Sequence, residues 1–314
     1  MSFEPVVLFF LLGVAAGLAR SDLKIPSSIY DALSIFLLLA IGLKGGVMLA
    51  EHAEAGMLLD GAVIVLAGAL IPFIAFPLLR WVGRMNRADS ASIAAHYGSV
   101  SVVTFSVGVT FLAQEGQVYE GYMIAFLVLL EMPALLIGVL LARHGQGSVK
   151  WGKLLHEVFF GKSIFLLAGG LLIGYLAGAE GIKPLDKLFF DLFKGVLALF
   201  LLEMGLVAAG RVADLRAHGP FLIGFAMVMP LISGLLGVMV AWSVDLTLGG
   251  ALLLATLYAS ASYIAAPAAM RIAVPEANPG LSIGAALGVT FPFNLFVGIP
   301  VYYWMAQTLY RLGG

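Results

Sequence analysis

The chain has 314 residues, of which 61% are hydrophobic and 11% charged, and its formal net charge is −1. A soluble domain carries about 25% charged residues, so the composition excludes an ordinary soluble protein, and the near-neutral charge provides no basic surface for nucleic acid. Cysteine does not occur in the sequence, which excludes disulfides, zinc–thiolate sites and thiol catalysis.

Ten apolar segments follow one another along the chain, most of them near the length of about twenty residues that crosses a bilayer core. Such long runs predict helices, because in lipid each backbone amide must find its partner within its own segment. We therefore predict an all-α membrane protein with ten transmembrane helices, at residues 4–19, 28–50, 57–82, 89–113, 118–142, 160–179, 188–210, 219–243, 247–273 and 280–310.

Lysine and arginine are unevenly distributed between the loops that connect these segments. The even-numbered loops and both ends hold only Lys183, Lys187 and Arg311. The odd-numbered loops hold Arg20, Lys24, Arg80, Arg84, Arg87, Arg143, Lys150, Lys153, Lys162, Arg211, Arg216 and Arg271. Cytoplasmic loops are enriched in these residues, so we expect the odd-numbered loops in the cytoplasm and both termini outside.

The second half of the chain repeats features of the first at a shift of about 161 residues. The sequence Tyr-Gly-Ser-Val-Ser at 97–101 returns as Tyr-Ala-Ser-Ala-Ser at 258–262. A duplication with five segments in each half forces the second half to enter the membrane in the opposite sense. We therefore predict two inverted repeats, 1–143 and 160–314, joined by a cytoplasmic loop at 144–159.

Small polar residues interrupt the fourth and ninth segments at matching places of this repeat, and Pro267 predicts a helix break in the ninth. The second half of a broken helix begins with free amides and about half a positive charge. Paired interruptions are typical of transporter sites, and such helix ends suit a small anion. Close helix association is the alternative role of the small residues. The candidate substrate-binding residues are Gly98, Ser99, Ser101, Thr104, Ser260, Ala261, Ser262 and Tyr263.

Four charged residues lie inside the segments, where charge is costly and usually functional or paired. They are Lys44, Glu131, Lys194 and Glu203. Lys44 and Glu203 fall in matching segments of the two halves, so they are candidates for an ion pair; alternatively, Lys44 extends to the membrane surface.

Glu131 precedes a proline, and Asn294 lies near the matching place of the second half. Their oxygens, together with Thr104, are the candidate ligands of a sodium ion, and Glu131 is also a candidate proton site. Helix–helix hydrogen bonds are the alternative role. Neither a phosphate loop, a zinc signature, a nucleophile elbow nor a dinucleotide fingerprint occurs. We expect neither an enzyme nor a cofactor, apart from sodium as coupling ion.

Three stretches carry a family resemblance: Ile-Gly-Leu-Lys-Gly-Gly at 41–46, Glu-Met-Pro-Ala-Leu at 131–135, and Val-Pro-Glu-Ala-Asn-Pro-Gly at 274–280 after Arg271. Over most of its length the chain resembles the sodium-dependent bicarbonate transporter family known from cyanobacteria. The resemblance implies two inverted repeats with two crossing broken helices, a core and a gate domain, and a homotrimer in the bacterial inner membrane. It also implies sodium-coupled bicarbonate uptake, inhibited by a PII-like protein from the cytoplasm.

The chain departs from the family pattern at three places. Tyr263 stands where an acidic residue is expected, Val102 and Val103 replace Gly-Ser, and Glu131 replaces Asp. We predict a secondary transporter that imports a small anion, with bicarbonate favoured, in symport with sodium. The alternatives are a carrier of another small carboxylate or oxyanion, a cation–proton antiporter of similar crossed-helix fold, or a membrane receptor or scaffold for a cytoplasmic partner.

Overall fold

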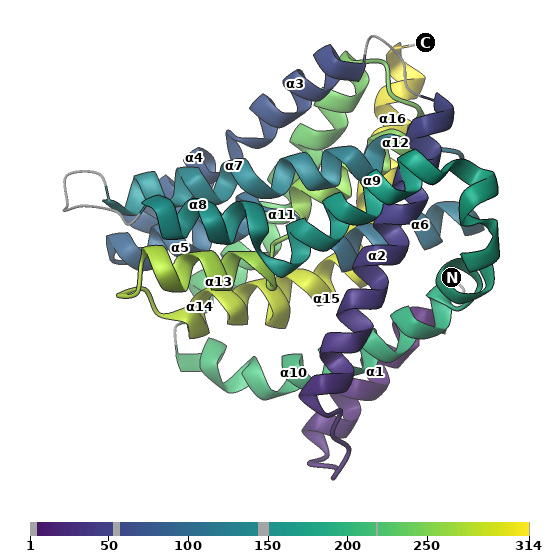
Figure 1. Ribbon diagram of the computed structural model, residues 1–314. Coiled ribbons are helices and arrows are strands. Elements are labelled where there is room, and N and C mark those ends of the chain that lie inside the picture. Colours follow the sequence, from purple (N-terminus) through teal and green to yellow (C-terminus); the bar gives the residue numbers. More distant parts are fainter. Residues whose placement is uncertain (1–4, 53–56, 144–150, 218, 314) are drawn as a thin grey trace.

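The computed structural model describes residues 5–52, 57–143, 151–217 and 219–313, and these residues form helices joined by short connections, with no strand among them (Figure 1). The predicted all-α class is therefore confirmed. Within the described residues, eight helices are long and apolar enough to cross a membrane, and Pro5–Leu18 and Leu248–Ala259 are shorter apolar helices.

The helices keep close to the expected segments. The first half contains α1 (Pro5–Leu18), α2 (Ser27–His52), α3 (Met57–Gly68), α4 (Ile71–Pro77), α5 (Arg87–Gly98), α6 (Val102–Gln114) and α7 (Met123–Arg143). After it come α8 (Trp151–Phe160), α9 (Lys162–Ile182), α10 (Phe193–Ala217), α11 (Pro220–Ser243), α12 (Leu248–Ala259), α13 (Ala265–Ala273), α14 (Pro279–Ala285), α15 (Phe291–Phe293) and α16 (Ile299–Gly313). Short 3₁₀ or π turns connect some of them: η1 (Leu78–Val82), η2 (Lys183–Leu185), η3 (Lys187–Asp191), η4 (Ala286–Thr290) and η5 (Asn294–Gly298).

Helix α8 lies where the sequence analysis expected only a connecting loop, which is a correction. Residues 144–150 of that loop lie outside the described residues. Apolar residues recur in α8 at helical spacing, so one face is apolar. Leu154 and Val158 are buried beside α13, whereas Trp151 and Phe159 on the same short helix stay exposed. Burial of one face against α13 explains why this segment is helical.

Helices α1, α2, α9 and α10, here called the four-helix group, associate most extensively as the pairs α2–α9 and α1–α10 (Figure 1). Glycines allow both pairs to approach closely. A Cβ atom added at Gly13 of α1 would collide with the carbonyl oxygen of Leu202 in α10, and one added at Gly46 of α2 would collide with that of Leu171 in α9. Small residues at such contacts are typical of helix association in lipid.

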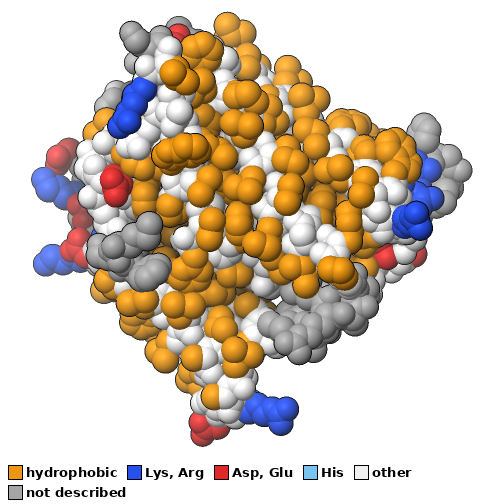
Figure 2. All heavy atoms as spheres, turned by 180° about the vertical axis from the view of Figure 1, so that it is seen from behind, with side chains coloured by type: hydrophobic (Ala, Val, Ile, Leu, Met, Phe, Trp, Pro, Cys, Tyr) orange, Lys and Arg blue, Asp and Glu red, His pale blue; other side chains and the backbone are white. Residues whose placement is uncertain are grey.

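The other helices form the main bundle, whose centre is occupied by α5, α6 and α12. Helix α12 is buried from Gly249 to its end at Ala259. Figure 2 shows hydrophobic side chains spread over one face of the molecule, with charged side chains near its margins. Large apolar residues such as Leu58, Leu66 and Leu176 are more than two-thirds exposed. Exposed apolar surface on this scale fits a molecule surrounded by lipid.

We expect Gly46→Ala to lower the melting temperature in detergent, because the added methyl group forces α2 and α9 apart. Overfilling a well-packed contact costs about 1–3 kcal/mol. Gly169→Ala is the matched control, since a Cβ there meets nothing within 4 Å and alanine favours the helix by about 0.8–1.0 kcal/mol. Thermal unfolding of both variants measures the difference; equal or higher stability of Gly46→Ala would contradict close α2–α9 contact.

Candidate functional site

The fourth segment is interrupted between Gly98, the last residue of α5, and Val102, the first of α6. We call residues 99–101 the first break. Ser99 and Ser101 are both extended there. The Ser101 side chain accepts a hydrogen bond from the backbone amide of Thr104 at 3.2 Å, so it caps the start of α6. Serine is among the residues preferred in this position.

The ninth segment is interrupted between Ala259 of α12 and Ala265 of α13, and we call residues 260–264 the second break. The Ser262 hydroxyl accepts a hydrogen bond from the amide of Ala266 at 3.2 Å. Pro267 lies in the first turn of α13, after the break. Proline is tolerated there because that turn needs no amide donor, so the expectation that Pro267 itself breaks the helix is corrected.

The two breaks contact each other, and we call this contact the junction. The amide of Ser101 donates to the Ser260 hydroxyl at 2.8 Å, and the amide of Ser262 donates to the carbonyl oxygen of His96 at 2.8 Å. The Ser101 hydroxyl also donates to the Tyr263 hydroxyl at 3.3 Å. The fold thus brings together two serine clusters that are about 160 residues apart in sequence.

Hydroxyl groups at the junction are engaged with one another or with backbone. Ser260 donates to the carbonyl oxygen of Leu257 at 2.8 Å, and Thr104 donates to the Ser101 hydroxyl at 3.0 Å. Ser101, Ser260 and Thr104 are at most 4% exposed. A hydroxyl can rotate to a new partner without moving the backbone, so a ligand that enters the junction can take over these donors.

Gly98 and Ala261 are two further candidates, and Gly98 has a clear steric role. A Cβ atom at Gly98 would collide with the ring of Pro72 and lie 2.8 Å from Cβ of Ala134, so only glycine lets α5 approach both neighbours. Ala261 is 3% exposed within the second break. Gly98 therefore sets how closely α5 approaches its neighbours, whereas Ala261 is a small buried residue of the second break.

Two tyrosines anchor the helices that lead into the breaks. Tyr97 hydrogen-bonds to Thr290 at 2.6 Å, which donates to the carbonyl oxygen of Ala226 at 2.6 Å. Tyr258, at the matching position of the other half, donates to the carbonyl oxygen of Ile64. In the sequence these tyrosines stand out only as part of the repeat. Their matching positions were the available signal for a shared anchoring role.

Glu131 lies beside the first break, where its backbone carbonyl accepts a hydrogen bond from the Ser99 hydroxyl at 3.4 Å. Glu131 is 2% exposed, and its Oε2 has no hydrogen-bond partner among the described residues. Burial of an ionised carboxylate without a partner is very costly, so Glu131 requires either a proton or a cation. His96, Glu203 and Thr256 also have a buried side-chain atom without a hydrogen-bond partner among the described residues.

Asn294 lies beside the second break. Its side-chain amide donates to the carbonyl oxygen of Ala259, the last residue of α12, at 2.9 Å, and its Oδ1 accepts from Tyr302 at 2.7 Å. Asn294 thus joins two helices by hydrogen bonds, which was the alternative role. Within the described part of the chain, hydrogen bonds do not join Glu131, Thr104 and Asn294 to one another.

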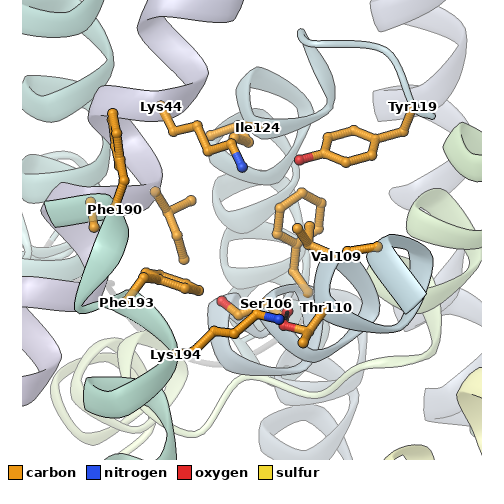
Figure 3. A pocket seen from close by; sticks show the side chains of 13 residues that line it. Lys44, Ser106, Val109, Thr110, Tyr119, Ile124, Phe190, Phe193 and Lys194 are labelled. Carbon is orange, nitrogen blue, oxygen red and sulfur yellow. Dashed lines mark hydrogen bonds between the residues drawn. The ribbon is translucent and has the colours of Figure 1, made fainter. Parts of the chain in front are cut away.

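A cavity of about 180 Å³ lies between the four-helix group and the main bundle (Figure 3). Lys44 of α2 and Lys194 of α10 line it, with Ser106 and Thr110 of α6 and with Tyr119. Burial raises the pKa of the Tyr119 hydroxyl, so this group stays neutral and able to donate a hydrogen bond. The cavity begins at Phe105, about one turn after Ser101 along α6.

A second cavity, of about 310 Å³, is lined by Tyr263 of the second break, by Glu203 of α10 and by Tyr30 of α2. Lys44 and Glu203 therefore face different cavities, and no ion pair joins them in the described residues. The candidate ion pair is therefore not formed, because Lys44 of α2 and Glu203 of α10 line separate cavities.

A model of the Na⁺-dependent bicarbonate transporter superfamily matches residues 5–307, nearly the whole chain. The chain belongs to this superfamily. It is therefore a multi-pass membrane protein from a family of transporters, and it is not expected to be an enzyme. A search of curated proteins finds no match to the chain.

Proposed function

We propose that the protein is a secondary transporter that imports bicarbonate together with sodium and binds the anion at the junction of the two breaks. The observation that carries the proposal is the junction itself. Helices α6 and α13 both begin there, and their first turns present amide groups and partial positive charge to the same buried place. A neutral, hydroxyl-rich site of this kind holds a small anion without a fixed counter-charge.

We propose further that ten helices form two inverted repeats of five, with a mobile gate domain and a core domain. Matching contacts support this proposal. The pair α1–α10 joins segments one and seven, and the pair α2–α9 joins segments two and six. The repeat relates segment one to segment six and segment two to segment seven, so it relates the two pairs to each other. Tyr97 of segment four reaches segment eight through Thr290, and Tyr258 of segment nine reaches segment three. A duplicated fold produces contacts in such pairs.

Alternating access then follows from movement of the four-helix group against the main bundle. The two cavities lie between these parts and reach residues close to the junction, Phe105 and Ser106 in one and Tyr263 in the other. Opening one cavity while closing the other would expose the junction to one side of the membrane at a time. The sodium gradient would supply the drive.

Glu131 is the proposed coupling site, with Thr104 and Asn294 as further oxygen ligands. Sodium is a hard cation that prefers oxygen, and the buried carboxyl of Glu131 needs a positive partner or a proton. The family's expected acid is replaced by Tyr263, whose hydroxyl instead accepts a hydrogen bond from Ser101. A single free carboxyl also suits proton coupling, which is the second candidate.

The assembly and its surroundings are part of the same proposal. On the family resemblance, we propose a homotrimer in the bacterial inner membrane, with both termini external and a PII-like regulator on the cytoplasmic side. Exposed apolar side chains on the four-helix group, such as Leu12, Leu172 and Leu176, offer surface for contacts with lipid or with another subunit.

Uptake of labelled bicarbonate into proteoliposomes tests the function. We expect accumulation with an inward sodium gradient, and only slow equilibration with potassium in its place. Accumulation driven equally well by a proton gradient alone would favour the proton-coupled candidate. No uptake in any gradient would contradict bicarbonate transport.

We expect Ser101→Ala and Ser262→Ala each to weaken apparent bicarbonate affinity about tenfold or more, since a hydrogen bond to a charged group contributes about 1.5–3 kcal/mol. Both hydroxyls also accept a hydrogen bond from a first-turn amide, Thr104 of α6 and Ala266 of α13, so stability should fall by about 1 kcal/mol. Thr247→Ala is the matched control, because Thr247 caps α12 in the same way, by accepting from the amide of Gly250, away from the junction. If the serine variants lose stability but keep wild-type bicarbonate affinity, as the control is expected to, the anion site lies elsewhere.

For Glu131→Gln we expect loss of the stabilisation that sodium confers on the wild-type protein. A ligand at one hundred times its dissociation constant stabilises by about 2.7 kcal/mol, so the wild-type melting temperature should rise with sodium. The glutamine variant should have the same melting temperature in sodium as in potassium. Glu115→Gln, at an exposed position, should keep the response. A sodium-dependent shift that survives in Glu131→Gln would remove Glu131 from the cation site.

A further inference from the structure

The cavity beside Lys44 has an unusual charge pattern. Lys44 and Lys194 approach it from α2 and α10, and Figure 3 shows their ammonium ends directed into the same space. The hydroxyls of Ser106, Thr110 and Tyr119 line the same cavity, whereas its lining includes neither aspartate nor glutamate. The hydroxyls of Ser106 and Thr110 donate to carbonyl oxygens of their own helix at 2.7 and 2.9 Å. The positive charge of the two lysines is therefore the main attraction that the cavity offers to an anion.

These two lysines lack an acidic partner in the described part of the chain. The ion pairs there join Arg143 with Glu276, Lys162 with Asp31, and Lys183 with Glu180. Two like charges that face one cavity repel each other, and an anion between them turns this repulsion into attraction. A cavity of about 180 Å³ has room for a small oxyanion with part of its water, since one water occupies about 30 Å³.

We propose that this cavity is an anion-collecting vestibule, in which Lys44 and Lys194 bind a small monovalent oxyanion before it passes along α6 to the junction. This inference rests on the proposed function and deepens it. In the structure Tyr119 lies in the connection between α6 and α7. The predicted topology puts this connection on the external side, so we expect the vestibule to face the external solution. A positively charged cleft raises the local anion concentration and accelerates association by about 10–10³-fold.

The position of the cavity relative to the junction supports this path. Ser106 follows the cap residue Ser101 by five positions on α6, about 7.5 Å along the helix axis. Phe105, between them in sequence, lines the cavity as well. The wall of the cavity therefore begins about one helical turn after Ser101, close to the proposed substrate site.

The chain contains no cysteine, so a single introduced cysteine reports the charge of the cavity without any transport. We would introduce Val109→Cys, at a position that lines the cavity, and measure its reaction rates with an anionic and a cationic methanethiosulfonate reagent. We expect the anionic-to-cationic rate ratio to be at least about tenfold higher than at Val118→Cys, an exposed position outside the cavity.

Adding Lys44→Gln and Lys194→Gln should bring the ratio at position 109 down to the value at position 118. Lys187→Gln is the matched control, because it removes the same charge from an exposed residue that does not line the cavity. An unchanged ratio in the double variant would overturn the proposal, whether or not the protein transports bicarbonate.

The second measurement is bicarbonate uptake at low and at high ionic strength. We expect the double glutamine variant to need about tenfold more bicarbonate for half-maximal uptake at low ionic strength, with an unchanged maximal rate and little difference at high salt, where charges are screened. Arginine at both positions should restore affinity. Uptake indistinguishable from wild type in the double glutamine variant would also overturn the vestibule, whereas no uptake by the wild type would refute the transport function instead.

Discussion

The structure depends on two hydrogen bonds that join its broken helices. A backbone amide that leaves a helix inside lipid has no water to bind, and each unsatisfied group costs several kcal/mol. Here the amide of Ser101 donates to Ser260, and the amide of Ser262 donates to the carbonyl oxygen of His96. Each break therefore supplies a hydrogen-bond acceptor for a backbone amide of the other break. Neither interruption would be tolerated alone at the centre of the main bundle.

This mutual dependence explains the surrounding residues. Tyr97 and Tyr258 fix the helices that lead into the breaks to neighbouring helices, and Asn294 holds the end of α12 through the carbonyl oxygen of Ala259. The junction is rigidly supported but neutral, and its hydroxyls are exchangeable donors. A small anion is the ligand that such a place suits, while Glu131 supplies the nearby group that requires a cation or a proton.

Much of this arrangement could be predicted, and the failures have physical causes. Hydrophobic length predicted the segments, and the serine clusters at 99–101 and 260–262 marked where two of them are interrupted, because both signals are local. Pro267 misled the prediction, since a proline in a first helical turn breaks nothing. The α8 helix was missed because it is short and only half apolar. Whether Lys44 faces Glu203 or Lys194 depends on the rotation of α2 and α10 about their own axes. The order of the segments along the chain does not determine this rotation.

A structure determined by electron cryomicroscopy with bicarbonate and sodium present would locate the bound anion. We expect anion density at the junction, within hydrogen-bond distance of the first-turn amides of α6 and α13, with the hydroxyls of Ser101 and Ser262 turned towards it. Anion density elsewhere, with the bonds between Ser101, Ser260 and Tyr263 unchanged, would contradict this expectation.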